Sequence, residues 1–549
     1  MPGGTLNLVS EGASNTIING NPSKTFWKAK YAKHTNFGKQ KIRLDYEGTP
    51  TLKLNEESTF TFKVEKYGDL LMDCFVSIDL PNIWSPIMPP NVNNNNSWIP
   101  YEYKWIDYIG ASMIKEVSIK CGNQTIQEYS GEYILACAQR DFEKNKLDLF
   151  YEMIGHTNEL NDPGNTGSNV NAYPNCLASQ SQIGPSPSIR GKTLTIPLNA
   201  WFMMKAQNAF PLISITNNDL LISLTFRPIS ELFRIRDVID EANNYPYVAP
   251  NFNKMEMQFY RFLQPPPSIT LLNSDFQDRR VIWNANIHLN CTYVFLSKEE
   301  ADVFENKDQS YLITQPFRRE YHDVVGNNKI NLNSLGLIKS WMFYFRRSDV
   351  NLRNEWTNLT NWAYDYIPLD IIHASHWNDN FPTENFNPAI NDDGSPTNLF
   401  ITSEYDPIND KDILLSMGIE LDGTYRENIL KSEIYSQIEK YTNSTGNAPS
   451  GLYCYNFCLD TSPYSLQPSG GMNMTNYKNI NLEFSTITPL KNAEAIVQAR
   501  CNDNGDFIGT TKNLSKLYDY TYDLIIFEEK LNLIQFKDGF DKYIYVVLI

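Results

Sequence analysis

The sequence predicts an all-β protein of two consecutive antiparallel β-sandwiches, with long loops and a few short helices. Many short segments alternate apolar and polar residues with a period of two, which is typical of strands that bury one face. Glycine and proline are scattered along the chain rather than clustered, as expected for a protein of many turns. Because the chain has 549 residues, one hydrophobic core cannot accommodate it, and two or more domains are expected.

Composition restricts the class of function. Hydrophobic residues make up 42% of the chain, which favours a folded protein over a disordered one. The aromatic content of 13% is high and suits β-sheets. The net charge of −16 argues against a dedicated nucleic-acid binder, because phosphate contact needs a basic surface. Direct nucleic-acid binding is therefore not expected.

Cysteine spacing and apolar run lengths indicate the compartment. The eight cysteines are widely spaced and form no Cys-x-x-Cys pair, so we interpret them as small buried residues of a protein from a reducing compartment. Cys454 and Cys458 share a face of a presumed strand, where extended geometry keeps them too far apart to bridge. The first residues do not read as a signal peptide, and no apolar run approaches the ~20 residues that span a bilayer. A soluble protein made in the cytosol is expected.

Residues 1–30 are predicted to form an N-terminal arm, because residues 1–20 are small, polar and interrupted by glycine. Basic and aromatic side chains gather in the stretch that follows, with Lys24, Phe26, Trp27, Lys28, Tyr31 and His34 as the candidate contact residues. This mixture suits contact with an acidic partner or a membrane surface. The alternative is an arm that is solvated or buried at an interface.

Alternating segments make up the first half of the chain. In residues 59–65, Phe60, Phe62 and Val64 face inward while the residues between them face solvent. A short helix is predicted within 132–151, and a second one after the capping box that starts at Ser297. Loops are predicted at 86–100 and 158–187. The further predicted strands are 74–80, a strand, turn and strand within 105–129, and then 193–198, 221–226 and 286–296.

The second half repeats this style without a literal sequence repeat. A long loop is predicted from about 348 to 410. Strands are predicted at 311–315, 329–333, 341–345, 413–417 and 543–549. The two halves therefore share an order of elements rather than a sequence pattern.

The stretch 453–484 is predicted to be a tight corner between two sheet elements. Strand-like runs flank residues 467–471, which cannot continue a strand because a proline lacks a ladder donor and paired glycines permit positive φ. We expect Gly470 or Gly471 to adopt positive φ and the Asn473 side chain to cap freed backbone groups. The residues of this corner motif are Gln467, Pro468, Ser469, Gly470, Asn473 and Thr475.

Motifs for catalysis, cofactors and metals are not found in the sequence. It contains no Gly-x-Ser-x-Gly elbow, phosphate loop or dinucleotide fingerprint. His373 and His376 stand beside Asp379, but a metal site needs further ligands, and we interpret this spacing as incidental. Adjacent carboxylates such as Glu528 and Glu529 would point to opposite faces of a strand, which makes them poor acid–base pairs. No enzyme activity, cofactor or metal is predicted.

The corner motif also carries a family resemblance. Gln-Pro-Ser-Gly at 467–470, followed by Asn473 and Thr475 and then a strand, resembles a signature of the major capsid proteins of nucleocytoplasmic large DNA viruses. Similar segments follow in the family's order over nearly the whole chain. They include Gly20-Asn21-Pro22, His34-Thr35-Asn36-Phe37, the hairpin that contains Trp105 and Gly110, and Asp422-Gly423-Thr424-Tyr425-Arg426. The chain departs from the pattern mainly at its long loops.

The resemblance implies that both sandwiches are jelly rolls lying side by side. Periodicity alone does not distinguish a jelly roll from another sandwich. The first roll is expected over 31–308, with an insertion at about 227–280, and the second over 309–549. The prolines at 265–267 are a tempting boundary, but in the family a strand and helix such as 286–296 and its successor close the first domain. The boundary is therefore predicted near Asp308.

The resemblance further implies a structural function in a virion. Members of the family form trimers of near-hexagonal outline that tile an icosahedral shell around an internal membrane and a DNA genome. The implied partners are the homotrimer, neighbouring capsomers, minor capsid proteins and the internal viral membrane, the last through the N-terminal arm. Synthesis and assembly would take place in the host cytoplasm. The alternatives are a minor capsid protein and a lectin-like jelly roll that binds sugar through exposed aromatic residues within 356–366.

Overall fold

The structure is a computed structural model in which β-strands dominate. Among the residues it describes, the helices are too short or too polar to cross a lipid bilayer. The helices are α3 (Ile109–Ser112), α4 (Gly131–Asp141), α5 (Lys144–Met153), α6 (Asn158–Asn161), α7 (Lys298–Asn306) and α8 (Glu439–Asn443). The described residues are 21, 23, 31–85, 87–88, 99–161, 163, 187–215, 218–238, 247–266, 276–281, 283–362, 386–390, 396–402, 411–489, 498–501, 507–511, 520–537 and 543–548.

Two facing sheets form the first sandwich, called the first roll below. One sheet has the order β1-β14-β3, with two short strands that also pair with β3; its strands are β1 (Phe37–Leu44), β14 (His288–Leu296), β3 (Leu70–Asp79), β9 (Thr193–Pro197) and β10 (Phe210–Pro211). The other sheet has the order β2-β11-β7-β8; its strands are β2 (Ser58–Val64), β11 (Leu220–Phe226), β7 (Ile114–Cys121) and β8 (Gln124–Tyr129). All of these pairings are antiparallel.

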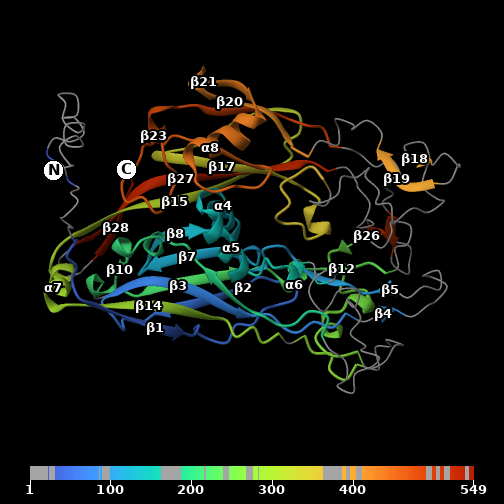
Figure 1. The fold of residues 1–549 in the computed structure, drawn as a ribbon, viewed down its shortest axis with the longest axis horizontal. Coiled ribbons are helices and arrows are strands. Elements are labelled where there is room, and N and C mark those ends of the chain that lie inside the picture. Colours follow the sequence, from blue (N-terminus) through green and yellow to red (C-terminus); the bar gives the residue numbers. More distant parts are fainter. Residues whose placement is uncertain are drawn as a thin grey trace, which may run out of the picture.

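A second pair of sheets forms the second roll. Its larger sheet has the order β15-β27-β17-β22, to which two further strands add; its members are β15 (Gln309–Tyr321), β27 (Tyr522–Lys537), β17 (Leu337–Arg347), β22 (Leu452–Asn456), β23 (Met472–Asn473) and β28 (Tyr543–Leu548). Its smaller sheet has the order β16-β24-β20-β21, with β16 (Asn327–Asn331), β24 (Ile480–Thr486), β20 (Leu414–Leu421) and β21 (Thr424–Lys431). The two rolls lie one above the other in Figure 1, with α4 between them.

The two rolls have the same strand order. In each larger sheet the last long strand (β14 or β27) lies between the first and the third of the roll's strands, which are β1 and β3 or β15 and β17. In each smaller sheet the edge strand (β8 or β21) forms a hairpin with its neighbour. Eight strands arranged in this way form a jelly roll of two Greek keys. The predicted fold class is confirmed, and both sandwiches are jelly rolls.

Shorter strands lie at one end of the molecule. Part of the predicted insertion forms a small sheet with residues near 104, made of β13 (Tyr247–Val248), β12 (Phe233–Arg236) and β6 (Tyr103–Trp105). The hairpins are β4 (Ile87–Met88) with β5 (Ile99–Pro100), β18 (Phe386–Ile390) with β19 (Pro396–Thr402), and β25 (Gln498–Cys501) with β26 (Phe507–Thr511). Figure 1 shows β4, β5, β12, β18, β19 and β26 together at the end opposite to α7 and β28.

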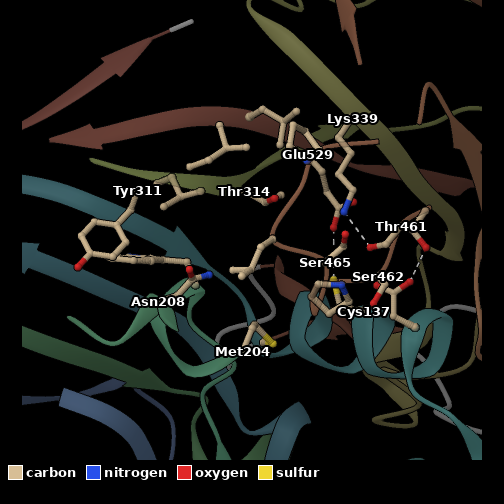
Figure 2. A pocket seen from close by; sticks show the side chains of 18 of the residues that line it. Cys137, Met204, Asn208, Tyr311, Thr314, Lys339, Thr461, Ser462, Ser465 and Glu529 are labelled. Atoms are coloured by element: carbon tan, nitrogen blue, oxygen red, sulfur yellow. Dashed lines mark hydrogen bonds between the residues drawn. The ribbon is translucent and has the colours of Figure 1, made fainter. Parts of the chain in front are cut away.

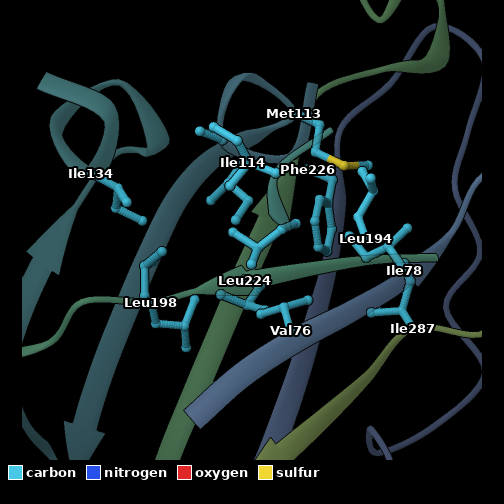
Figure 3. Packing of buried hydrophobic residues seen from close by; sticks show 14 of the residues in the cluster. Val76, Ile78, Met113, Ile114, Ile134, Leu194, Leu198, Leu224, Phe226 and Ile287 are labelled. Carbon is cyan, nitrogen blue, oxygen red and sulfur yellow. The ribbon is translucent and has the colours of Figure 1, made fainter. Parts of the chain in front are cut away.

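Apolar side chains from both sheets fill the first roll. Val76 and Ile78 of β3 meet Leu224 and Phe226 of β11 in Figure 3, and all four are fully buried. The prediction for 59–65 is confirmed, because the three apolar positions of β2 are buried and the intervening ones are more exposed. Since each fully buried aliphatic or phenyl side chain contributes roughly 1.5–3 kcal/mol, this interior is the main source of stability.

The predicted helices need two corrections. The helix expected within 132–151 is two helices, because Phe142 adopts an extended conformation (φ −83°, ψ 135°) that ends α4 before α5 begins. Ser297 does precede α7, but its side chain makes no capping hydrogen bond; its carbonyl accepts instead from the backbone N–H groups of Glu300 and Ala301. The helix was predicted correctly, and the reason given for its start was wrong.

Most predicted strands are present, with boundaries shifted by a few residues. The segment 286–296 corresponds to β14, which is hydrogen-bonded to β1 on one side and β3 on the other. The cysteines that the structure describes are unbridged, as Cys454 and Cys458 were expected to be. The loops predicted at 86–100, 158–187 and 348–410 lie largely outside the described residues.

Candidate functional site

Helix α4 is held between the two rolls. The hydroxyl of Ser130 accepts a hydrogen bond from the backbone N–H of Tyr133 at 3.3 Å and so caps the first turn of α4. Residue 131 is glycine because a Cβ there would lie 1.9 Å from the carbonyl oxygen of Ala111, so α4 starts in direct contact with the first roll. On its other side Ala136 packs among buried apolar residues of the second roll, namely Met342, Tyr344, Leu452, Cys454, Ile525 and Phe527.

The C-terminal end of α4 carries a buried ion-pair cluster. The guanidinium of Arg140 donates to Asp141 at 2.9 and 2.7 Å and to Glu529 of β27 at 3.0 and 3.1 Å. Ser340 of β17 also donates to Glu529, and Thr461 donates to Asp141 at 2.6 Å. All five residues are buried, so charges from both rolls neutralise one another away from water. Removing one partner of such a cluster is costly.

Electrostatics keep Glu529 ionised despite its burial. Burial by itself raises the pKa of this carboxyl, but the positive charges of Arg140 and Lys339 and hydrogen bonds from Arg140 and Ser340 lower the pKa to about 2. In Asp141 burial prevails and the pKa is raised. Glu528 belongs to the opposite face of β27, where it pairs with Arg319 at 3.1 Å. The expected orientation of this carboxylate pair is therefore confirmed.

A second ion-pair cluster surrounds Glu132 at the start of α4. Its carboxylate accepts from Tyr344 at 2.8 Å, Arg346 at 2.8 Å and Arg227 at 3.0 Å, so residues of both rolls meet on one acid. Burial raises its pKa, whereas the arginines Arg346, Arg227 and Arg318 and the hydrogen bond from Tyr344 lower it to about 2. Both ends of α4 are thus joined to the second roll by charges, fully buried at Arg140 and partly buried at Glu132.

A cavity of about 550 Å³ lies next to the first of these clusters (Figure 2). Tyr311 and Thr314 of β15 line one part of it, and Lys339, Thr461 and Glu529 line another. The ammonium group of Lys339 donates to the carbonyl of Thr461 at 2.8 Å. Residues from both rolls and from the corner motif therefore border a single cavity.

The corner motif forms one wall of this cavity and is firmly held. Gly470 has φ 139°, as expected for one of the two glycines, and a Cβ there would lie 3.0 Å from the carbonyl oxygen of Phe457. The Asn473 side chain accepts from the backbone N–H of Thr475 at 3.0 Å, and the Thr475 hydroxyl accepts from the N–H of Gly336 at 3.0 Å. The expected conformation and cap are confirmed.

The remaining motif residues differ in their surroundings. The Ser469 hydroxyl accepts from the backbone N–H of Asp460 at 3.0 Å and donates to its carbonyl at 2.9 Å. Gln467 and Pro468 are exposed at the cavity wall. The structural role assigned to these six residues stays a prediction, now with a defined geometry.

The candidate arm residues are only partly described. Lys24, Phe26, Trp27 and Lys28 lie outside the described residues. Tyr31 is 88% exposed, and the Nδ1 atom of His34 lies 3.0 Å from the carbonyl oxygen of Thr35. Neither side chain belongs to the cavity or to the ion-pair clusters, and their proposed contacts stay a prediction.

The candidate metal sites have little structural support. His373, His376 and Asp379 lie outside the described residues. Within the described part of the chain, Glu320, His322 and Asp523 could together reach one metal ion, but Glu320 already pairs with Arg318 at 2.7 Å. A neighbouring guanidinium disfavours a cation there, and we assign no metal site.

Trp356, proposed above as a sugar-binding aromatic, has another role. Its indole N–H donates to the carbonyl of Glu231 at 3.0 Å, and the guanidinium of Arg227 lies 4.6 Å from the centre of its ring. The tryptophan therefore joins the two rolls rather than standing exposed, which removes one of the observations that suggested a lectin-like surface.

Sequence reasoning did not identify the ion-pair clusters. The residues that meet in them are far apart in sequence, with 389 positions between Arg140 and Glu529. One local signal was available: Glu528-Glu529-Lys530 interrupts an otherwise apolar strand, and charges within an apolar strand need partners. That signal indicates a buried pair but does not identify α4 as its partner.

Two jelly rolls joined side by side through ion pairs define a double jelly-roll fold. Comparison with known families agrees along most of the chain. The family model described as major capsid protein N-terminus matches residues 25–263, and the one described as large eukaryotic DNA virus major capsid protein matches residues 300–541. The chain belongs to the major capsid protein family of large eukaryotic DNA viruses.

Individual relatives are distant in sequence. The major capsid protein of Chrysochromulina ericina virus is 24% identical over 355 residues, which are 61% of this chain and 55% of that protein. That of Phaeocystis pouchetii virus is 27% identical over 243 residues, 44% of each chain. The chain thus spans about half the length of these two relatives. The major capsid protein of Paramecium bursaria Chlorella virus 1 is 20% identical over 492 residues, covering 89% of this chain and 88% of that protein.

Solved structures confirm the fold. The capsid protein in the quasi-atomic PBCV-1 virus capsid superimposes with a TM-score of 0.57 at 16% identity, covering 95% of this chain and 99% of that one. The Faustovirus major capsid protein gives 0.57 at 13% identity, with coverage of 93% and 92%. At these identities the likeness concerns the fold, and it extends over both rolls.

Proposed function

We propose that this chain is the main shell subunit of a large double-stranded DNA virus and assembles as a homotrimer of near-hexagonal outline. The observation that carries the proposal is that one chain holds two rolls of the same strand order side by side. Three such chains present six similar edges, so one building block can fill a hexagonal lattice and tile an icosahedral shell. The function is then geometric, and no enzyme activity is part of it.

The ion-pair clusters around α4 support this proposal physically. A lattice needs the same angle between the two rolls in every copy, and a flexible joint would give edges of variable shape. Buried, mutually hydrogen-bonded charges favour one arrangement because any other leaves a charge without a partner. We infer that Arg140, Glu529 and Glu132 fix this angle.

The proposed setting is the virion. Neighbouring capsomers contact the sides of the shell subunit, and minor capsid proteins contact the side that faces the interior of the virion. The N-terminal arm, with Lys24, Phe26, Trp27 and Lys28, faces the internal viral membrane, for which its basic and aromatic residues are suited. The loops at the end with β18 and β19 decorate the outer face. Subunits are made and assembled in the host cytoplasm. A minor capsid protein of the same fold is the alternative.

Light scattering of the purified full chain at about micromolar concentration tests the proposal. A stable species with three times the mass of one chain is expected. A protein that remains a monomer over this concentration range contradicts the shell function. Binding of free sugar by such a monomer would favour the lectin-like alternative.

A further inference from the structure

Two buried cysteines face each other inside the first roll. Cys74 of β3 and Cys291 of β14 are directly opposite in the antiparallel register, and both side chains are fully buried. Their Sγ atoms lie 3.3 Å apart. Among the cysteines that the structure describes, these two stand opposite each other on paired strands, whereas Cys121 and Cys454 have no cysteine opposite. The strand register therefore brings two thiols into direct contact.

The backbone places this pair at a narrow position of the sheet. The N–H of Leu198, just after β9, donates to the carbonyl of Cys74, so the backbone groups of Cys74 point toward β9 and away from β14. Cys74 and Cys291 thus form a non-hydrogen-bonded pair, in which the Cα atoms are about 4.5 Å apart and the side chains are closest. A disulfide accepts Cα separations from about 4.4 Å upward and a sulfur–sulfur distance of about 2.05 Å. The strands therefore already have a spacing that a disulfide requires.

The surroundings of the pair are apolar and make its oxidation slow. Cys74 shares the core-facing side of β3 with Val76 and Ile78, which lie among the packed side chains of Figure 3. Burial raises the pKa of the Cys74 thiol, so the thiolate that reacts with oxidants forms rarely. A disulfide has no charge and no S–H donor, and it suits this environment once it has formed.

We propose that Cys74 and Cys291 are an oxidation site, at which a peroxide converts the two thiols into a disulfide that fastens β14 to β3. One sulfur, as the thiolate, attacks a peroxide oxygen; the O–O bond breaks, and a sulfenic acid and one water form. The other sulfur then attacks the sulfenic sulfur, the S–S bond forms, and the hydroxyl group leaves as a second water. The two thiols are oxidised, and hydrogen peroxide is reduced to two molecules of water.

The bond would stabilise the first roll by closing a long loop. Cys74 and Cys291 are 217 positions apart, and β14 is the last strand of the roll. Because a disulfide restricts the unfolded chain more strongly when its loop is longer, the oxidised roll should unfold at a higher temperature. The timing rests on the proposed function: a subunit made in the reducing cytosol meets an oxidising medium only after the virion is released.

Peroxide treatment of the folded full chain tests this site. The protein is purified with dithiothreitol, freed of it, exposed to hydrogen peroxide, and then denatured in an alkylating agent that blocks the remaining thiols. Peptide mass spectrometry should find Cys74 and Cys291 in one cross-linked pair, lighter than the two free peptides by two hydrogen atoms. The thermal midpoint of the oxidised chain should exceed that of the reduced chain by about 5 °C, and dithiothreitol should remove the difference.

Two serine variants separate this bond from other oxidation. In Cys291→Ser the cross-link and the effect of dithiothreitol on the midpoint should both disappear. Cys454→Ser is the matched control, because Cys454 is also fully buried on a strand but lies opposite Met342, and it should retain both. The cross-link in wild type is decisive even where a variant fails to fold.

Three results would overturn the inference and leave the proposed shell function untouched. The first is that both thiols of the peroxide-treated wild type remain open to alkylation. The second is that they become sulfinic acids or bond to other cysteines. The third is that the effect of dithiothreitol on the midpoint persists in Cys291→Ser, which would assign the stabilisation to another pair.

Discussion

At the scale of single residues, the corner motif shows how a short sequence fixes backbone geometry. Gly470 lies in the left-handed half of conformational space, where a side chain is strained, and its neighbour across the corner is a backbone carbonyl that cannot move easily. Asn473 then holds the next turn through one side-chain hydrogen bond. Both features were expected from residue types alone, because glycine and asparagine have few other uses at such positions.

Substituting these two residues should destabilise the second roll. In the variant Gly470→Val/Asn473→Ala, the strained backbone costs roughly 1–2 kcal/mol, and loss of the exposed cap costs about 1 kcal/mol. A lower thermal midpoint and a lower yield of trimer are expected, measured by calorimetry and light scattering. Gly38→Ala is the control, because Gly38 does not have positive φ and a Cβ there meets only the Cβ of Phe295, at an ordinary contact distance of 3.9 Å. An unchanged midpoint in the double variant would show that the corner is only a surface loop.

At the scale of elements, α4 joins the two rolls by a different charge at each end. Glu132 at its start and Arg140 near its end each meet residues of β17 or β27. The helix is therefore a shared element whose stability depends on both rolls. Because its carboxyl groups take part in these ion pairs, the contact between the two rolls is sensitive to pH.

Glu132 should make the protein less stable in acid. Its pKa is about 2 in the folded protein and 4.5 in the absence of partners, so the unfolded chain binds a proton more readily. The contribution of Glu132 is therefore complete above about pH 4.5 and is lost as the pH falls toward 2. We expect the difference in urea midpoint between wild type and Glu132→Gln to be largest near about pH 6 and to narrow near about pH 3.

A matched control separates this effect from general acid unfolding. Glu56 is exposed and pairs with Lys53 at 2.7 Å, so Glu56→Gln should shift the midpoint little at any pH. A difference between wild type and Glu132→Gln that stays constant with pH would mean that Glu132 acts through packing rather than charge.

How far the sequence predicts these elements depends on how local their causes are. Strands such as β2 and β11 follow from alternation within seven residues, and the corner follows from its own glycine and asparagine. The small sheet of β6, β12 and β13 was not predicted, because its strands are two to four residues long and β6 pairs with β12 across more than a hundred positions. The cavity and both ion-pair clusters were not predicted for a similar reason, because they are formed by residues far apart in sequence.

At the scale of the whole molecule, the chain is a repeat that sequence comparison of its halves does not reveal. Both rolls use the same strand order, yet their outer faces differ: the outer face of β17, β22 and β27 in the second roll is apolar and covered by α4, whereas β1 at the edge of the first roll is exposed along most of its length. The order of the strands follows from the packing of the two sheets of each roll, whereas the residues of each outer face depend on the neighbour that covers that face. The similarity is therefore kept in topology and lost in residue identity.

The boundary between the rolls provides the last prediction. We place it near Asp308, so that β14 belongs to the first roll although it follows the prolines at 265–267. β14 is hydrogen-bonded to β1 and β3 on its two sides, whereas the next strand, β15, pairs with β27. Strands of one sheet exchange their amide hydrogens together when that sheet opens. Destabilising the second roll alone should therefore leave β14 protected to the same extent as β3.

Hydrogen exchange in the variant Gly470→Val/Asn473→Ala tests this boundary. Its amides in β17 and β27 should exchange faster than in wild type, because the corner connects to β17 through β23. Those of β14 should change only as much as those of β3, whatever the coupling between the rolls. The Gly38→Ala control should change neither group beyond a small local effect. Exchange in β14 that follows β27 and departs from β3 would place the boundary before β14, at the prolines.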